Sequence, residues 1–122
     1  MTAPRDPTPE DDGRLWALRS WESDRLVLVL HGDLDMSTLP TAQDEVTAAE
    51  SQSPPVLVLD LSHLGYVDSS GVRLVLLAQH VAQAASRRLA VRLGNGAARH
   101  VFELLGITGR LEVLDDEESS SR

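Results

Sequence analysis

The chain has 122 residues, of which 42% are hydrophobic and 3% aromatic, and its formal net charge is −8 at pH 7. This length fits one domain with a single core. The negative charge disfavours binding to nucleic acid, because the phosphate backbone would be repelled. With no cysteine in the chain, disulfides and cysteine-ligated metals are excluded.

The two ends differ in composition from the middle of the chain. Residues 1–13 carry three prolines and four acidic residues, and residues 115–122 are acidic and serine-rich. Such segments bury too little apolar surface to fold, so we expect two disordered tails around one domain at 14–114. There is no signal-peptide pattern and no run near the roughly 18 apolar residues of a membrane span. We therefore expect a cytoplasmic protein that does not contact a membrane.

The first half of the domain reads as a hairpin and a helix. Leu15–Trp21 alternates apolar and polar residues, and Arg25–His31 is a continuous apolar run, which predicts two strands joined by a turn. Gly32–Ser37 is predicted to be a loop that ends in a capping hydroxyl. Apolar residues then recur at helical spacing between Leu39 and Ala49, with Pro40 in the first turn.

The second half alternates strands and helices. Its predicted strands are Val56–Leu61, Leu89–Leu93 and the short Arg110–Leu114, and its predicted helices are 71–86 and Ala97–Leu105, the latter stopped by Gly106. Strand–helix alternation implies parallel strands with right-handed crossovers. Together with the hairpin, this predicts an α/β fold with a mixed sheet packed against helices.

The segment GYVDSSGVRL, Gly65–Leu74, stands between a predicted strand and a predicted helix. Serine at such a junction most often caps the helix, so Ser69 and Ser70 have a structural interpretation. A helix N-terminus also stabilises a phosphate, and Gly71 lets the backbone come close without a Cβ. The residues alone leave both interpretations open.

Three motifs occur in one order along the chain: GDLDMSTLP, VLDLSHLGYVDSSGVRLVLL and GNGAARHVFELLGITGRLEVL. Together they resemble the STAS domain family, and within it the bacterial anti-sigma factor antagonists. The resemblance spans about Leu15–Leu114. Asp33 replaces the usual glutamate, and Arg73 stands where the family often has a small residue.

The resemblance implies a phosphorylation switch. The unphosphorylated protein would bind an anti-sigma factor that is also a serine kinase of the GHKL type, and so free a sigma factor. The kinase would phosphorylate Ser69 and a PPM-type phosphatase would reset it. Asp35, Asp68, Ser70 and Gly71 would form the switch and partner-binding region. From the residues alone, Asp68 can instead make an Asx turn, Asp35 can be a turn or cap residue, and Ser70 is mainly a cap.

Other functions find little support. There is no G-x-S-x-G motif of a serine hydrolase, and Gly94–Gly96 lacks the third glycine of a dinucleotide loop. We therefore expect no enzyme activity and no cofactor. We also expect no metal, because the spacing of the four histidines is not that of metal ligands: His31, His63, His80 and His100. One alternative keeps the fold: a stand-alone STAS scaffold subunit of a lipid-transport ABC complex, or part of a sensory assembly, without a phosphate cycle.

Overall fold

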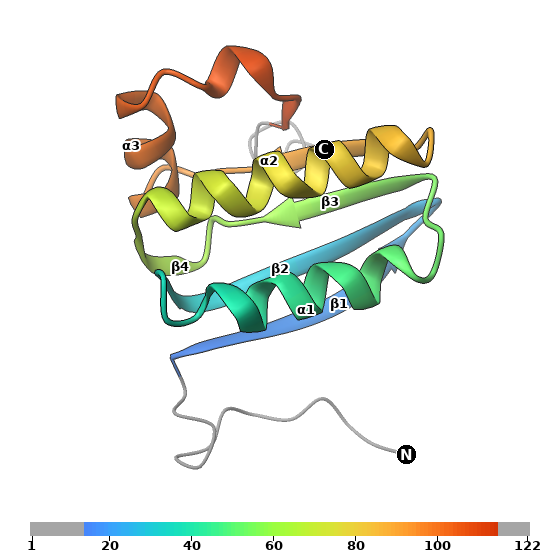
Figure 1. Ribbon diagram of the computed structural model, residues 1–122, viewed down its shortest axis with the longest axis horizontal. Helices are drawn as coiled ribbons and strands as arrows, with labels where there is room; N and C mark the ends of the chain where they lie inside the picture. Colours follow the sequence, from blue (N-terminus) through green and yellow to red (C-terminus); the bar gives the residue numbers. More distant parts are fainter. Residues whose placement is uncertain (1–13, 115–122) are drawn as a thin grey trace.

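The computed structural model describes residues 14–114, and the predicted tails at 1–13 and 115–122 lie outside this range. Strands and helices alternate after an initial hairpin (Figure 1). In chain order the elements are β1 (Leu15–Glu22), β2 (Arg25–Leu34), α1 (Leu39–Glu50), β3 (Val56–Asp60), β4 (Leu64–Val67), α2 (Ser69–Ala84), β5 (Arg88–Arg92), α3 (Ala97–Leu104), a 3₁₀ turn (Thr108–Arg110) and β6 (Val113–Leu114).

The sheet is mixed, as the sequence predicts. Strands β1 and β2 pair antiparallel, from Leu15 opposite Gly32 to Glu22 opposite Arg25. Strands β2, β3, β5 and β6 run parallel, and the order across the sheet is β1-β2-β3-β5-β6. Strand β4 pairs with the end of β2, on the same side as β3. The parallel strands therefore all end at one edge of the molecule.

The helices cover one face of this sheet. Helices α1 and α2 lie side by side across it, and α3 lies at the end where α2 begins (Figure 1). Each long helix buries apolar residues at helical spacing, which removes one stripe of its surface from water. These residues pack against alternate residues of the strands and form the main core: Leu39, Ala42, Val46 and Ala49 from α1, and Leu74, Val75, Ala78 and Ala82 from α2.

The prediction of a loop at Gly32–Ser37 is wrong for its first three residues. Strand β2 continues to Leu34 because it finds a partner in β4, a strand that the apolar pattern did not predict. The pairing shifts register between Gly32 and Asp33, and Gly32 has a φ of +100°. The strand signal is local, whereas this pairing joins residues about thirty positions apart, so the pattern could not reveal it.

The other element ends differ in smaller ways. Helix α2 begins at Ser69 and ends at Ala84, two residues earlier at each end than predicted. The last strand is confined to Val113–Leu114, because Thr108–Arg110 form a 3₁₀ turn. Gly106 follows α3 with a φ of +71°, which confirms the predicted left-handed stop.

The second face of the sheet carries a smaller apolar cluster of Val27, Val56, Val58 and Ala90. No helix in residues 14–114 contributes to this cluster. Further along β2, the ring of His31 stacks on Trp16 of β1 with centroids 4.0 Å apart and an interplanar angle of 4°. The ring of His63 lies 4.9 Å from that of His31. Two imidazole rings therefore lie next to each other, that of His31 partly buried and that of His63 exposed.

Because of this pair of imidazoles, we expect the folded domain to lose stability in mild acid. Burial and the nearby His63 lower the pKa of His31 below 6.5, and Asp60 opposes them only in part. Below pH 6.5 the unfolded chain then takes up a proton more readily than the folded chain, so stability falls as the pH drops toward the folded pKa. As the pH falls from 7.5 to 5.5, the free energy of unfolding measured in urea should decrease more in the natural chain than in a His31→Gln variant.

The control for this prediction is His80→Gln, because His80 is exposed on α2. As the pH falls, His80→Gln should lose as much stability as the natural chain does. A His31→Gln variant whose pH dependence matches that of the natural chain would show that the folded protein does not hold His31 in its neutral form.

Candidate functional site: the start of helix α2

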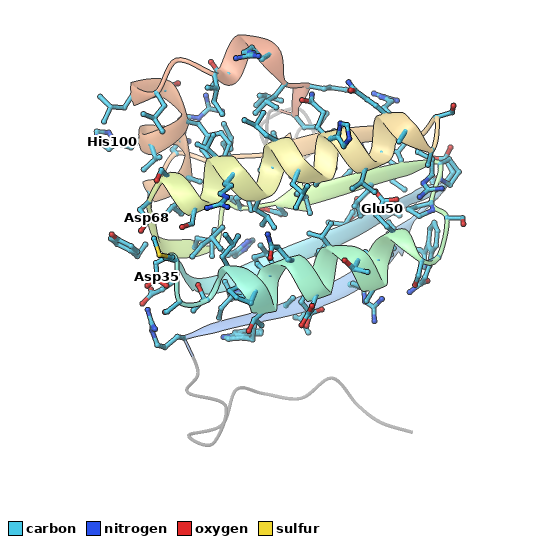
Figure 2. The ribbon with its side chains drawn as sticks, in the orientation of Figure 1. Asp35, Glu50, Asp68 and His100 are labelled. Atoms are coloured by element: carbon cyan, nitrogen blue, oxygen red, sulfur yellow. The ribbon has the colours of Figure 1, made fainter. Side chains whose placement is uncertain are left out.

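The sheet brings together the two loops that carry the residues predicted to form the switch, one with Asp35 and the other with Asp68; we call them the switch loops. Leu34 at the end of β2 is paired with Val67 at the end of β4, and the backbone N–H of Asp68 donates to the carbonyl of Leu34 at 3.2 Å. Asp35 and Asp68 directly follow this pair. Figure 2 accordingly places their side chains at the same end of the molecule. The ends of parallel strands are where an α/β fold commonly presents its ligand or partner site.

Asp68 is the residue that caps α2. Its backbone is extended, and its Oδ1 accepts a hydrogen bond from the backbone N–H of Ser70 at 2.8 Å. Its carbonyl accepts from the N–H of Gly71 at 2.9 Å. The expectation that Ser70 caps the helix is therefore wrong, since Ser69 and Ser70 are the first two helical residues. An aspartate also places negative charge at the positive end of the helix dipole.

Ser69 is exposed, whereas Ser70 and Gly71 are buried. The Ser69 hydroxyl makes no hydrogen bond with any residue in 14–114, so no internal contact has to break before it reacts. Its place in the first turn sets it beside backbone N–H groups without helical partners. Of the two serines in the motif, Ser69 is the one that a modifying enzyme can reach.

Gly71 is required for the close packing of the helix start. A Cβ at this position would lie 2.6 Å from Cγ1 of Val67 and 3.4 Å from Cδ2 of Leu34. Both neighbours belong to the main core and are at most 5% exposed. The sequence-based reason for this glycine was close approach of the backbone to a phosphate, whereas the structure shows a different need for it: core side chains fill the space of a Cβ.

Asp35 organises the loop before α1. Its Oδ1 accepts from the backbone N–H of Ser37 at 2.9 Å, from the Ser37 hydroxyl at 2.7 Å and from the N–H of Thr38 at 3.1 Å. Its other oxygen pairs with the guanidinium of Arg14. The hydroxyl of Ser37, with smaller contributions from Thr38 and Arg14, lowers the pKa of the Asp35 carboxyl. Asp35 is thus ionised at neutral pH.

These contacts change the expectation for the first helix. The predicted capping hydroxyl of Ser37 donates to Asp35 and does not cap α1. The N-cap position is Thr38, whose hydroxyl donates to the carbonyl of Asp33 at 2.8 Å. Asp35 therefore fills the turn role that the residues alone allowed. Arg14 was not predicted, because it lies before the first apolar strand and carries no motif.

Two large apolar side chains are exposed close to these polar groups. Met36 directly follows Asp35 and is 75% exposed, and Tyr66 of β4 is 49% exposed. Tyr66 is paired with Asp33 across β2 and β4. Methionine and aromatic residues are enriched in protein interfaces. We call these two residues, with Asp35, Asp68 and Ser69, the switch surface.

Substitution of Asp68 tests whether its hydrogen bond to the N–H of Ser70 stabilises the start of α2. Asp68→Ala should lower the free energy of unfolding by about 1 kcal/mol, because the N–H of Ser70 loses its acceptor. Asp68→Asn keeps an oxygen acceptor and should stay within a few tenths of a kcal/mol of the natural chain. Urea unfolding measures both variants. Equal losses in the two would mean that the charge of Asp68, and not its hydrogen bond, stabilises the helix start.

Within residues 14–114, no three histidine, aspartate or glutamate side chains gather where they could hold a metal ion. No helix in the described part of the chain is long and apolar enough to cross a membrane.

Comparison with known families settles the class of domain. The family model described as "Mlab, STAS domain" matches residues 17–115. The chain belongs to the STAS domain family. This match covers both switch loops and every strand from β2 to β6. A search of curated protein sequences finds no match.

Solved structures share the fold of this STAS domain. An anti-sigma factor antagonist from Mycobacterium paratuberculosis aligns with a TM-score of 0.73 at 23% identity, over 81% of this chain and 84% of that one. The anti-sigma factor antagonist SpoIIAA in its unphosphorylated form gives 0.67 at 23% identity, over 85% and 92%. The phosphorylated form of SpoIIAA, a Bacillus cell fate determinant, gives 0.60 at 23% identity, over 85% and 96%. At these identities the likeness establishes the fold.

Proposed function

We propose that this STAS domain is an anti-sigma factor antagonist. Unphosphorylated, it binds an anti-sigma factor that is also a GHKL-type serine kinase, and so frees a sigma factor. Phosphorylation of Ser69 switches this binding off. The observation that carries the proposal is the exposed Ser69 at the capped start of α2, on a surface that also exposes Met36 and Tyr66.

The chemistry belongs to the partners, and this domain is their substrate and ligand. The kinase moves the γ-phosphoryl group of ATP to Oγ of Ser69, ADP leaves, and the hydroxyl proton passes to a base or to water. A PPM-type phosphatase transfers the phosphoryl group to water and restores the serine. The exposed hydroxyl of Ser69 suits both steps, because neither enzyme has to unfold the domain. In this proposal the domain is not an enzyme and acts in the cytoplasm.

Phosphate on Ser69 opposes binding through charge. It adds about −1.5 to −2 at neutral pH. The carboxylates of Asp68 and Asp35 already lie at this end of the molecule, so a docked partner would bury one more anion beside them. Burying the exposed Met36 and Tyr66 against a partner then also requires stripping water from a phosphate. Ser70 and Gly71 contribute by keeping the helix start in place.

The direct test incubates the full chain with ATP and each anti-sigma serine kinase encoded in its own genome. We expect one kinase to add a single phosphate to Ser69, to label a Ser70→Ala variant at a similar rate, and to leave a Ser69→Ala variant unlabelled. Labelling of Ser70 instead would contradict the proposal. Absence of labelling by every kinase would favour the scaffold function in a lipid-transport or sensory assembly, where no phosphate cycle is needed.

A further inference from the structure

Arg73 lies one helical turn after Ser69, and both side chains are exposed. Both residues belong to α2, so their Cβ atoms are neighbours about 5–6 Å apart on one side of the helix. Side chains on a helix lean toward its N-terminus, which directs Arg73 back toward Ser69. In an α-helix this spacing suits a cation that pairs with an anion at the earlier position.

The guanidinium of Arg73 has no ion-pair or hydrogen-bond partner within residues 14–114. Six of the nine arginines in residues 14–114 form ion pairs: Arg14 with Asp35, Arg25 with Glu22, Arg87 with Glu50, Arg88 with Glu112, Arg92 with Asp60 and Glu22, and Arg99 with Glu103. Arg73 makes no such ion pair and no hydrogen bond with a described residue. Its charge is therefore available to a group that arrives later.

We infer that Arg73 is the intramolecular counter-ion of phosphorylated Ser69, an inference that rests on the proposed function. The planar guanidinium can donate to two phosphate oxygens at once, whereas a lysine ammonium acts as a point charge and matches this geometry less well. The surroundings favour a counter-ion, because Asp35 and Asp68 lie at the same end and the chain carries a net charge of −8. Arg14, the cation beside Asp35, is already engaged with that carboxylate.

Pairing with Arg73 changes the switch surface beyond the phosphate itself. In the unphosphorylated domain, an exposed cation stands one turn from the exposed serine. After phosphorylation, the same cation is drawn to the phosphate and is no longer available to an acidic group on a partner. One modification thus adds an anion and removes a free cation at one place. The pairing also holds the first turn of α2, so the phosphorylated domain stays folded.

The test places phosphoserine at position 69 of the full chain during translation, so that no kinase is required. The second ionisation of the phosphate is then followed by phosphorus NMR between pH 4.5 and 8. In the natural sequence this pKa should lie about half a unit lower than in Arg73→Ala, because the guanidinium favours the dianion. Arg73→Lys should fall between the two.

Arg19→Ala is the matched control, because Arg19 is an exposed arginine on β1 that also lacks an ion pair with a described residue. It should leave the phosphate pKa unchanged. Equal pKa values in the natural sequence and in Arg73→Ala would overturn the inference, as would an equal drop in Arg19→Ala. Because translation supplies the phosphate, this result is independent of whether a kinase modifies Ser69, and failure of the proposed function would be seen separately.

Discussion

Phosphorylation of Ser69 is expected to weaken binding of this STAS domain to the proposed anti-sigma kinase about a hundredfold, which corresponds to roughly 3 kcal/mol. The reason is local charge. The phosphate appears on a surface that already carries Asp35 and Asp68, and it must lose water when Met36 and Tyr66 are covered. The fold itself should not change, because the modified side chain is exposed at the start of α2.

Titration calorimetry of the purified partner against four chains measures this effect. The phosphorylated chain should bind about a hundredfold more weakly than the natural chain, and Ser69→Glu should lose part of the affinity because glutamate carries only one charge. Ser20→Glu adds the same charge at an exposed position on β1 and should bind normally. Equal affinity of the phosphorylated and unphosphorylated chains would contradict the charge mechanism.

Gly32→Ala is expected to lower the free energy of unfolding by about 3 kcal/mol or more. A Cβ at this position would lie 2.1 Å from the carbonyl oxygen of Arg14 and 2.8 Å from its carbonyl carbon. These are backbone atoms and cannot move aside as a flexible side chain can. The φ of +100° is also unfavourable for any residue with a Cβ.

The effect of Gly32→Ala should extend to the switch surface. The register shift after Gly32 sets the pairing of β2 with β4, and the N–H of Asp33 donates to the carbonyl of Arg14 at 2.5 Å. Gly65→Ala is the control, since a Cβ there would meet nothing closer than 3.9 Å and its φ is ordinary. Urea unfolding should separate the two variants by at least about 2 kcal/mol. A similar loss in both would mean that β2 and β4 adjust to a side chain at Gly32.

The sequence predicted those parts of the fold that local patterns determine. The helical spacing in α1 and α2 specifies helices that bury one stripe, and the continuous apolar run of β3 specifies a strand that is buried on both faces. Strand β4 was missed because Leu64–Val67 is short and half exposed, with only its two end residues buried. Its pairing depends on the end of β2, which no pattern within four residues can encode.

The candidate site was predicted in its residues but not in all their roles. The resemblance singled out Ser69 and Gly71, whereas the exposure of Ser69 and the packing of Gly71 against core side chains are seen only in the structure. The cap was assigned to serine, although the extended backbone of Asp68 places its carboxylate nearer the open N–H groups. The partnership of Arg14 with Asp35 arises from tertiary structure alone.

The central claim is that Ser69 is phosphorylated in the cell. Intact mass and phosphopeptide mapping of the chain, recovered from its own cells with and without stress, test it most directly beside a Ser69→Ala variant. A single phosphate within residues 65–73 that disappears in the variant, with occupancy that changes under stress, is the predicted result. Absence of phosphate in every condition, with Ser69→Ala behaving as the natural chain, would contradict the switch.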